Sequence, residues 1–132
     1  MVNYTQAGEI SNTAVVQVFT AGGTIARGEV VTITPAATST AAVCSSSDAS
    51  GNAPYAVAID NATSGQPVRC VIYGEVSVVA SGNCYRGAYV YGIGGKVATR
   101  AAGSGVDKAP ILGRVTEGAA DDGICTVFVG VY

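Results

Sequence analysis

The stretch APYAVAI at 53–59, followed after a polar turn by VRCVIYGEV at 68–76, decides the fold, because the chain contains its plan twice. The second copy reads APILGRV at 109–115, a polar turn, and ICTVFVGVY at 124–132. Upstream, IARGEVV at 25–31 matches CYRGAYV at 84–90. Nothing catalytic is repeated with these blocks, so the duplication indicates a structural module rather than an enzyme.

The segments between the turns have the patterns of short β-strands. Apolar and β-branched residues alternate or run together at 13–19, 29–34, 41–44, 55–59, 68–79, 87–91, 96–99, 111–115 and 124–132. Turn residues separate them about every 8–12 residues, and helical periodicity is nearly absent. We therefore expect an all-β fold, a compact sandwich or barrel built from two pseudo-repeats. Segment 68–79 should bend at Gly74, and the last strand should lie inside a sheet because both its faces are apolar.

The chain divides into an arm and one domain. Residues 1–12 are polar and contain glycine, which predicts an extended N-terminal arm. Residues 13–132 then form a single β domain, with pseudo-repeats at about 24–79 and 83–132. The apolar faces of two such short repeats are better buried against each other than left apart.

The composition limits the possible partners. Charged residues make up 12% of the 132 residues, and the formal net charge is −2. A surface with few charges fits one that a partner partly covers, and it equally fits a small β-protein rich in Ala, Ser and Thr. The basic residues are scattered, so we expect no nucleic-acid binding. There is no basic amphipathic or transmembrane-length stretch and no signal peptide, so we expect no membrane contact and synthesis in a cytoplasm.

Enzyme chemistry finds little support. The chain has no histidine, which excludes Ser-His-Asp and Cys-His catalysis and histidine metal ligands. Asp121 and Asp122 precede Gly123, a context typical of a turn rather than of paired catalytic carboxylates. We expect no catalytic residue, no cofactor and no metal. The cysteines form no CxxC pair and are either free thiols or partners in disulfides made after release from the cell: Cys44, Cys70, Cys84 and Cys125.

Two repeated or paired features admit two interpretations each. Arg27-Gly28 and Arg86-Gly87 fit a turn whose glycine has a positive φ and whose arginine lays its stem over the sheet. They also fit arginines that dock on a partner. Tyr89 and Tyr91, which share one strand face, fit either packing or stacking on a sugar ring.

The arm NYTQAG at 3–8, the block at 25–31, and YAVAID at 55–60 with GQPV at 65–68 resemble the two-repeat head-decoration, or capsid cement, proteins of bacteriophages. A second pass of the same glycine-and-valine pattern follows in RGAYV at 86–90, LGRV at 112–115 and GICTV at 123–127. The Ala/Ser/Thr-rich segment 35–51 and the four cysteines depart from the family pattern.

The resemblance implies a virion protein of the outer capsid surface, synthesised in the host cytoplasm. It would bind the major capsid protein as a homotrimer and tie capsid subunits together without catalysis. A polar arm can add a strand to a neighbour's sheet. Partner contacts are therefore expected at Tyr4, Gln6, Glu9, Arg27 and Arg86. The alternative is a carbohydrate- or receptor-binding β-module of another virion appendage. An enzyme that depends on Asp121 or Asp122 is a third possibility.

Overall fold

The computed structural model describes residues 6–34, 40–43, 55–99 and 111–130, and their regular structure is all β, as expected. Every predicted strand is present, with ends that move by a few residues. The strands are β1 (Val15–Ala21), β2 (Val30–Thr34), β3 (Thr40–Val43), β4 (Tyr55–Ala58), β5 (Pro67–Val79), β6 (Tyr89–Ile93), β7 (Lys96–Thr99), β8 (Gly113–Glu117) and β9 (Ile124–Val129).

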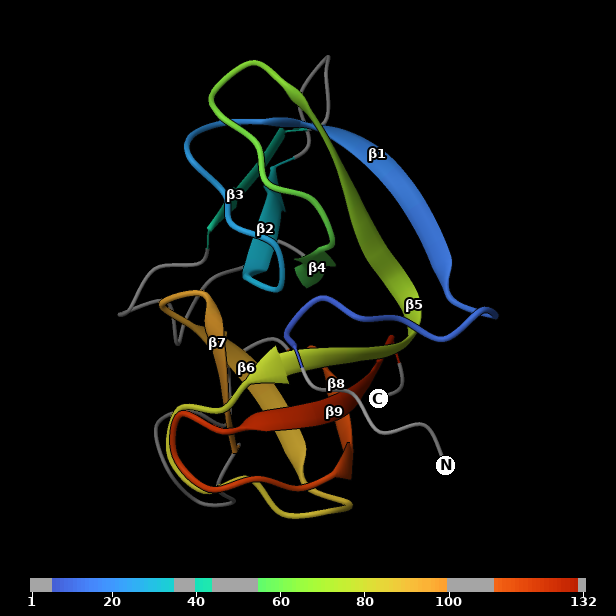
Figure 1. Cartoon of the computed structure of the whole chain (residues 1–132), viewed down its shortest axis with the longest axis vertical. Coiled ribbons are helices and arrows are strands. Elements are labelled where there is room, and N and C mark those ends of the chain that lie inside the picture. Colours follow the sequence, from blue (N-terminus) through green and yellow to red (C-terminus); the bar gives the residue numbers. More distant parts are fainter. Residues whose placement is uncertain (1–5, 35–39, 44–54, 100–110, 131–132) are drawn as a thin grey trace.

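The strands form two barrels that share β5 (Figure 1). In the first barrel the order is β1-β3-β2-β4-β5, and β5 pairs back with β1 to close the ring. In the second the order is β5-β9-β8-β6-β7, and a parallel bridge between Ala80 and Val97 joins the end of β5 to β7. The last strand, β9, lies between β5 and β8, which confirms its predicted central place.

Gly74 is where β5 passes from one barrel to the other. Its φ is 122°, and a Cβ at this position would lie 2.7 Å from the Cα of Ala14. Pro67–Tyr73 pairs with β1, whereas Gly74–Val79 pairs with β9. Figure 1 shows the strand turning between these two halves, which confirms the predicted bend.

Backbone pairing shows that the barrels are copies of one plan. Two bridges recur at equivalent places: Ala21–Ala41 as Ala80–Val97, and Ile25–Ala62 as Cys84–Ala119. β1 therefore corresponds to the second half of β5. The equivalence reaches further upstream than the blocks that match in sequence.

Two hydrophobic cores support the barrels. The first barrel has its own core, built on Phe19, Ile25 and small residues. The second core contains residues of both repeats, among them Val57 of the first and Val127 of the second. Fully burying one such valine contributes about 1.5–3 kcal/mol, so the shared core contributes to holding the two barrels together.

Buried thiols are part of these cores. Cys70, Cys84 and Cys125 are free and buried, and Cys44 lies outside the described residues. Burial raises the pKa of the Cys70 and Cys125 thiols to about 12. These cysteines therefore act as small apolar core residues, one of the two roles expected for them.

Residues 6–11 lie along the second half of β5. The N–H of Gly8 donates to the Ser77 carbonyl at 2.8 Å, and the Ser77 N–H donates to the Glu9 carbonyl at 2.9 Å. The Ser11 N–H donates to the Glu75 carbonyl at 3.1 Å. This part of the predicted arm thus lies against β5 of its own chain, joined by these hydrogen bonds and one isolated antiparallel bridge between Ile10 and Val76. Residues 1–5 lie outside the described part.

Candidate functional site

Two predicted partner residues, Gln6 and Glu9, have contacts inside the chain. The Glu9 carboxylate accepts a hydrogen bond from the Gln6 N–H at 2.7 Å. The buried Ser77 hydroxyl donates to the Gln6 carbonyl and accepts from the Glu9 N–H, the latter at 2.9 Å. Both residues therefore anchor the segment 6–11 on β5. The third predicted arm residue, Tyr4, lies outside the described residues.

The turn at Arg27-Gly28 packs against this segment. Gly28 has a φ of 90°, and a Cβ there would lie 2.4 Å from the Cβ of Ala7. Facing it, a Cβ on Gly8 would lie 2.6 Å from the Cγ of Arg27. The Arg27 stem thus covers the arm while the residue as a whole stays exposed. Gly28 thus has the positive φ that the turn interpretation predicts, and the Arg27 stem lies against the arm rather than over the sheet.

The equivalent turn at Arg86-Gly87 is uncovered. Gly87 also has a φ of 90°, but the nearest atom to a Cβ there would be Nη2 of Arg114, at 3.9 Å. Arg86 is exposed and lines a shallow hollow with 83–85 and 118–120. Arg27 lines a different hollow, between the arm and the first barrel. The structure therefore assigns the two arginines to different surfaces.

The outer side of the second barrel carries a surface that the sequence analysis did not identify. Tyr89 lies opposite Arg114, Arg114 opposite Phe128, and Phe128 opposite Glu75. Residues directly opposite each other in antiparallel strands share one face of the sheet. These four side chains thus form one row across β6, β8, β9 and β5, which we call the outer row.

Contacts between neighbours order the aromatic part of this surface. The Arg114 guanidinium carbon lies 4.8 Å from the centroid of the Tyr89 ring. Its Nε and Nη2 donate to the Gly87 carbonyl at 3.2 and 2.9 Å. The Tyr73 ring meets Phe128 edge-on, with centroids 5.3 Å apart. Tyr73 is 49% exposed and Tyr89 37%, so the aromatics are held in place and open to solvent.

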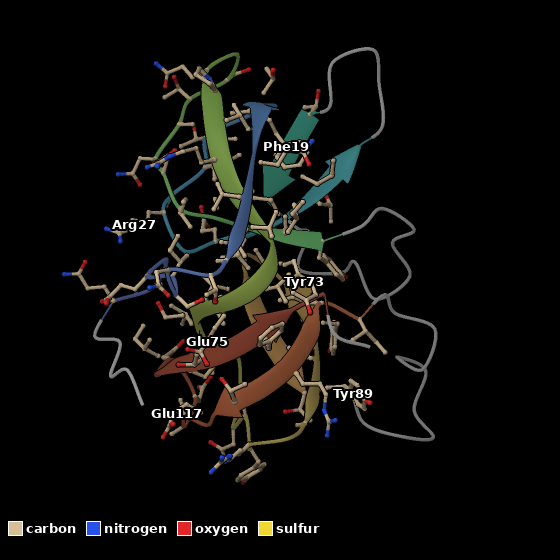
Figure 2. The ribbon with its side chains drawn as sticks, turned by 90° about the vertical axis from the view of Figure 1, so that its right-hand side faces the viewer. Phe19, Arg27, Tyr73, Glu75, Tyr89 and Glu117 are labelled. Atoms are coloured by element: carbon tan, nitrogen blue, oxygen red, sulfur yellow. The ribbon has the colours of Figure 1, made fainter. Side chains whose placement is uncertain are left out.

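The other half of the same face is acidic. Glu117 lies opposite Thr126, which shares its side of β9 with Phe128. The Thr116 hydroxyl donates to Oε2 of Glu75 at 3.2 Å. In Figure 2 Glu75 and Glu117 are on the left of this region, and Tyr73 and Tyr89 are on the right. The face therefore has an acidic side and an aromatic side.

The remaining candidates have structural roles. Tyr91 is half-buried and packs against the second core, so Tyr89 and Tyr91 do not form an exposed pair. The Asp121 carboxylate accepts the Gly82 N–H at 2.7 Å, and Asp122 pairs with Lys96 at 2.8 Å. Both aspartates lie in a turn, as the sequence indicated, and their side chains join that turn to Gly82 and to β7.

Across the described ranges, no cluster of three or more acidic or cysteine side chains is placed to hold a metal ion. In the same part of the chain, no helix has the length and hydropathy needed to traverse a lipid bilayer.

No protein-family model and no curated protein matches this sequence. The fold is similar to that of the N base of the head fiber gp8.5 of bacteriophage phi29, solved as a crystal structure, with a TM-score of 0.64. The match covers 89% of this chain and 95% of that chain at 14% sequence identity. At this identity the likeness establishes the fold, which is shared over almost the whole length of both chains.

Proposed function

We propose that this chain is a bacteriophage head protein that binds the outer surface of the assembled head and stabilises contacts between major capsid subunits. The observation that carries the proposal is the fold, shared over 89% of the chain with the base of a phage head fiber. The sequence resemblance to head-decoration proteins, which rests on motifs rather than on the fold, supports the same role.

The proposed role is physically reasonable for a small module with a modest surface. A protein that binds the assembled shell and not its separate subunits stabilises the shell by mass action. Many symmetric copies, proposed here to be homotrimers on the virion exterior, convert weak single contacts into strong net stabilisation. The role needs no catalysis, and we propose none.

Undecorated heads from the phage that encodes this chain test the proposal. The purified protein should co-sediment with such heads and raise the temperature at which they release DNA. Separate major capsid subunits, used as a control, should bind more weakly. Absence of co-sedimentation together with an unchanged release temperature contradicts the proposed function.

A receptor- or carbohydrate-binding module of a head appendage is the second candidate. Its support is the exposed Tyr89 ring with Arg114 packed against it, because an aromatic ring beside a hydrogen-bond donor suits a sugar ring. A glycan array is the direct measurement. Binding that is lost in Tyr89→Ala favours this candidate, and an array without any bound glycan counts against it.

A further inference from the structure

The outer row of the second barrel has a counterpart in the first. Pairing of β2, β4, β5 and β1 places four valines in an equivalent row, Val30–Val57–Val71–Val16. In strand order these valines correspond to Tyr89, Arg114, Phe128 and Glu75. The same row of four positions therefore carries only valine in the first barrel, whereas it carries aromatic or charged side chains in the second.

The valine row is an interface. Val30, Val57 and Val71 are each 0% exposed, and all belong to the core shared by both barrels. Val16 packs against the same core from β1. In the first barrel, this outward-facing row is thus buried against the second barrel of the same chain.

The outer row of the second barrel has the composition of an interface rather than of an ordinary solvent face. Tyrosine and arginine are, with tryptophan, the residues enriched at the energetic centres of protein contacts. Here they are already ordered, because Arg114 stacks on Tyr89 and Tyr73 packs edge-on against Phe128. Aromatic side chains held in one geometry lose little conformational entropy on binding.

A second copy of this chain cannot pack on the outer row as the second barrel packs on the valine row. Tyr, Arg and Phe are much larger than the valines that fill the internal interface, and close-packed interiors do not accept such an increase in volume. Glu75 and Glu117 add negative charge on one side of the face. A partner that offers a basic group to the exposed Glu117 and apolar surface over the rings complements this face.

We infer that the face formed by the outer row, Tyr73 and Glu117 is the docking surface for a different protein. That partner presents an apolar side chain to Tyr73 and Phe128 and a lysine or arginine to Glu117. The inference rests on the proposed function, in which the partner is the outer surface of the phage head.

Two variants with matched controls test the inference by co-sedimentation with undecorated heads. Tyr89→Ala removes an exposed ring of the face, and its control, Tyr85→Ala, removes a 68% exposed tyrosine that lines the hollow beside Arg86. Glu117→Lys reverses an acidic charge of the face, and Gln17→Lys adds a positive charge on exposed β1. Circular dichroism verifies that all four variants fold.

Tyr89→Ala and Glu117→Lys should each weaken head binding by about tenfold or more, the effect of losing a central interface contact, while both controls stay within about twofold of wild type. Normal binding by both face variants, while wild type binds, overturns the inference and leaves the proposed function standing. A wild-type protein that binds no head overturns the proposed function and this inference with it. A face variant that changes the oligomeric state in light scattering identifies the surface as a self-contact, which also overturns the inference.

Discussion

Val57 and Arg114 occupy the same position in the two barrels, yet Val57 is completely buried and Arg114 is exposed. The turns that carry Gly28 and Gly87 differ in the same sense, because the arm covers the first and leaves the second open. The backbone plan is common to both barrels. Side chains at outward positions therefore decide which face joins the two barrels and which face stays exposed.

The largest effect is expected from placing the second barrel's residue in the first. Val57→Arg buries an uncompensated charge in the shared core, which should cost roughly 3–5 kcal/mol of unfolding free energy, much of the stability of a small protein. The reverse change, Arg114→Val, alters an exposed stacking contact and should cost about 1 kcal/mol or less. Denaturant unfolding of both variants measures the difference. Equal losses would contradict the predicted difference in burial between the two positions.

A smaller difference in stability is expected between the variants Gly28→Ala and Gly87→Ala. Both glycines have a φ of 90°, so alanine at either position is strained by about 1–2 kcal/mol. Gly28→Ala also forces a Cβ into Ala7, which should add about 1–3 kcal/mol. Thermal unfolding of the pair isolates the packing of the arm. Indistinguishable melting temperatures would show that the arm does not rest on Gly28.

Removing the arm's anchor should have an intermediate effect on stability and a clear local effect. Ser77→Ala leaves the Gln6 carbonyl and the Glu9 N–H without their bonds to the buried hydroxyl, at a cost of about 0.5–1.5 kcal/mol for each bond. Limited proteolysis should then cut the arm faster. Ser64→Ala, in an exposed turn, is the control and should change stability by about 0.5 kcal/mol or less. An arm equally protected in both variants would contradict the anchor.

The smallest effect concerns an ion pair of the first barrel, for which the second has Thr126 in place of Arg69. Hydrogen bonds from Arg69, at 2.8 and 2.9 Å, hold the pKa of the Asp60 carboxyl below its ordinary value. The stabilisation is therefore present above the unfolded pKa of about 3.9 and is lost as the pH falls through the folded value. Asp60→Asn should be slightly less stable than wild type at neutral pH, and the difference should vanish in acid or high salt. A stability difference between wild type and Asp60→Asn that grows as the pH falls would contradict this pH dependence.

The strands, the bend at Gly74 and the central place of β9 were predictable, because each depends on local alternation or on one glycine. The contrast between Val57 and Arg114 was not. The ungapped sequence match aligns Val57 with Gly113, one residue away from the position that pairing gives it. Blocks rich in small and apolar residues can slide by one position with little loss of similarity, and a shift of one exchanges the two faces of a strand.

The predicted partner residues were only partly informative for a related reason. Polarity identified Gln6, Glu9 and Arg27 as surface candidates, but it could not show that the arm folds back on β5 and uses them. Tyr73 and Phe128 lie on adjacent strands and meet only once β5 pairs with β9. Their contact depends on long-range pairing, which a single sequence does not reveal.

Hydroxyl-radical footprinting of tyrosines, with and without undecorated heads, tests most directly whether the outer row, unlike the buried valine row, is a docking surface. Binding should protect Tyr73 and Tyr89, which lie on the proposed docking face, and leave Tyr85 as reactive as in the free protein. If Tyr85 is protected while Tyr73 and Tyr89 keep their reactivity in the bound state, the heads bind another surface, and the account of the outer row is contradicted.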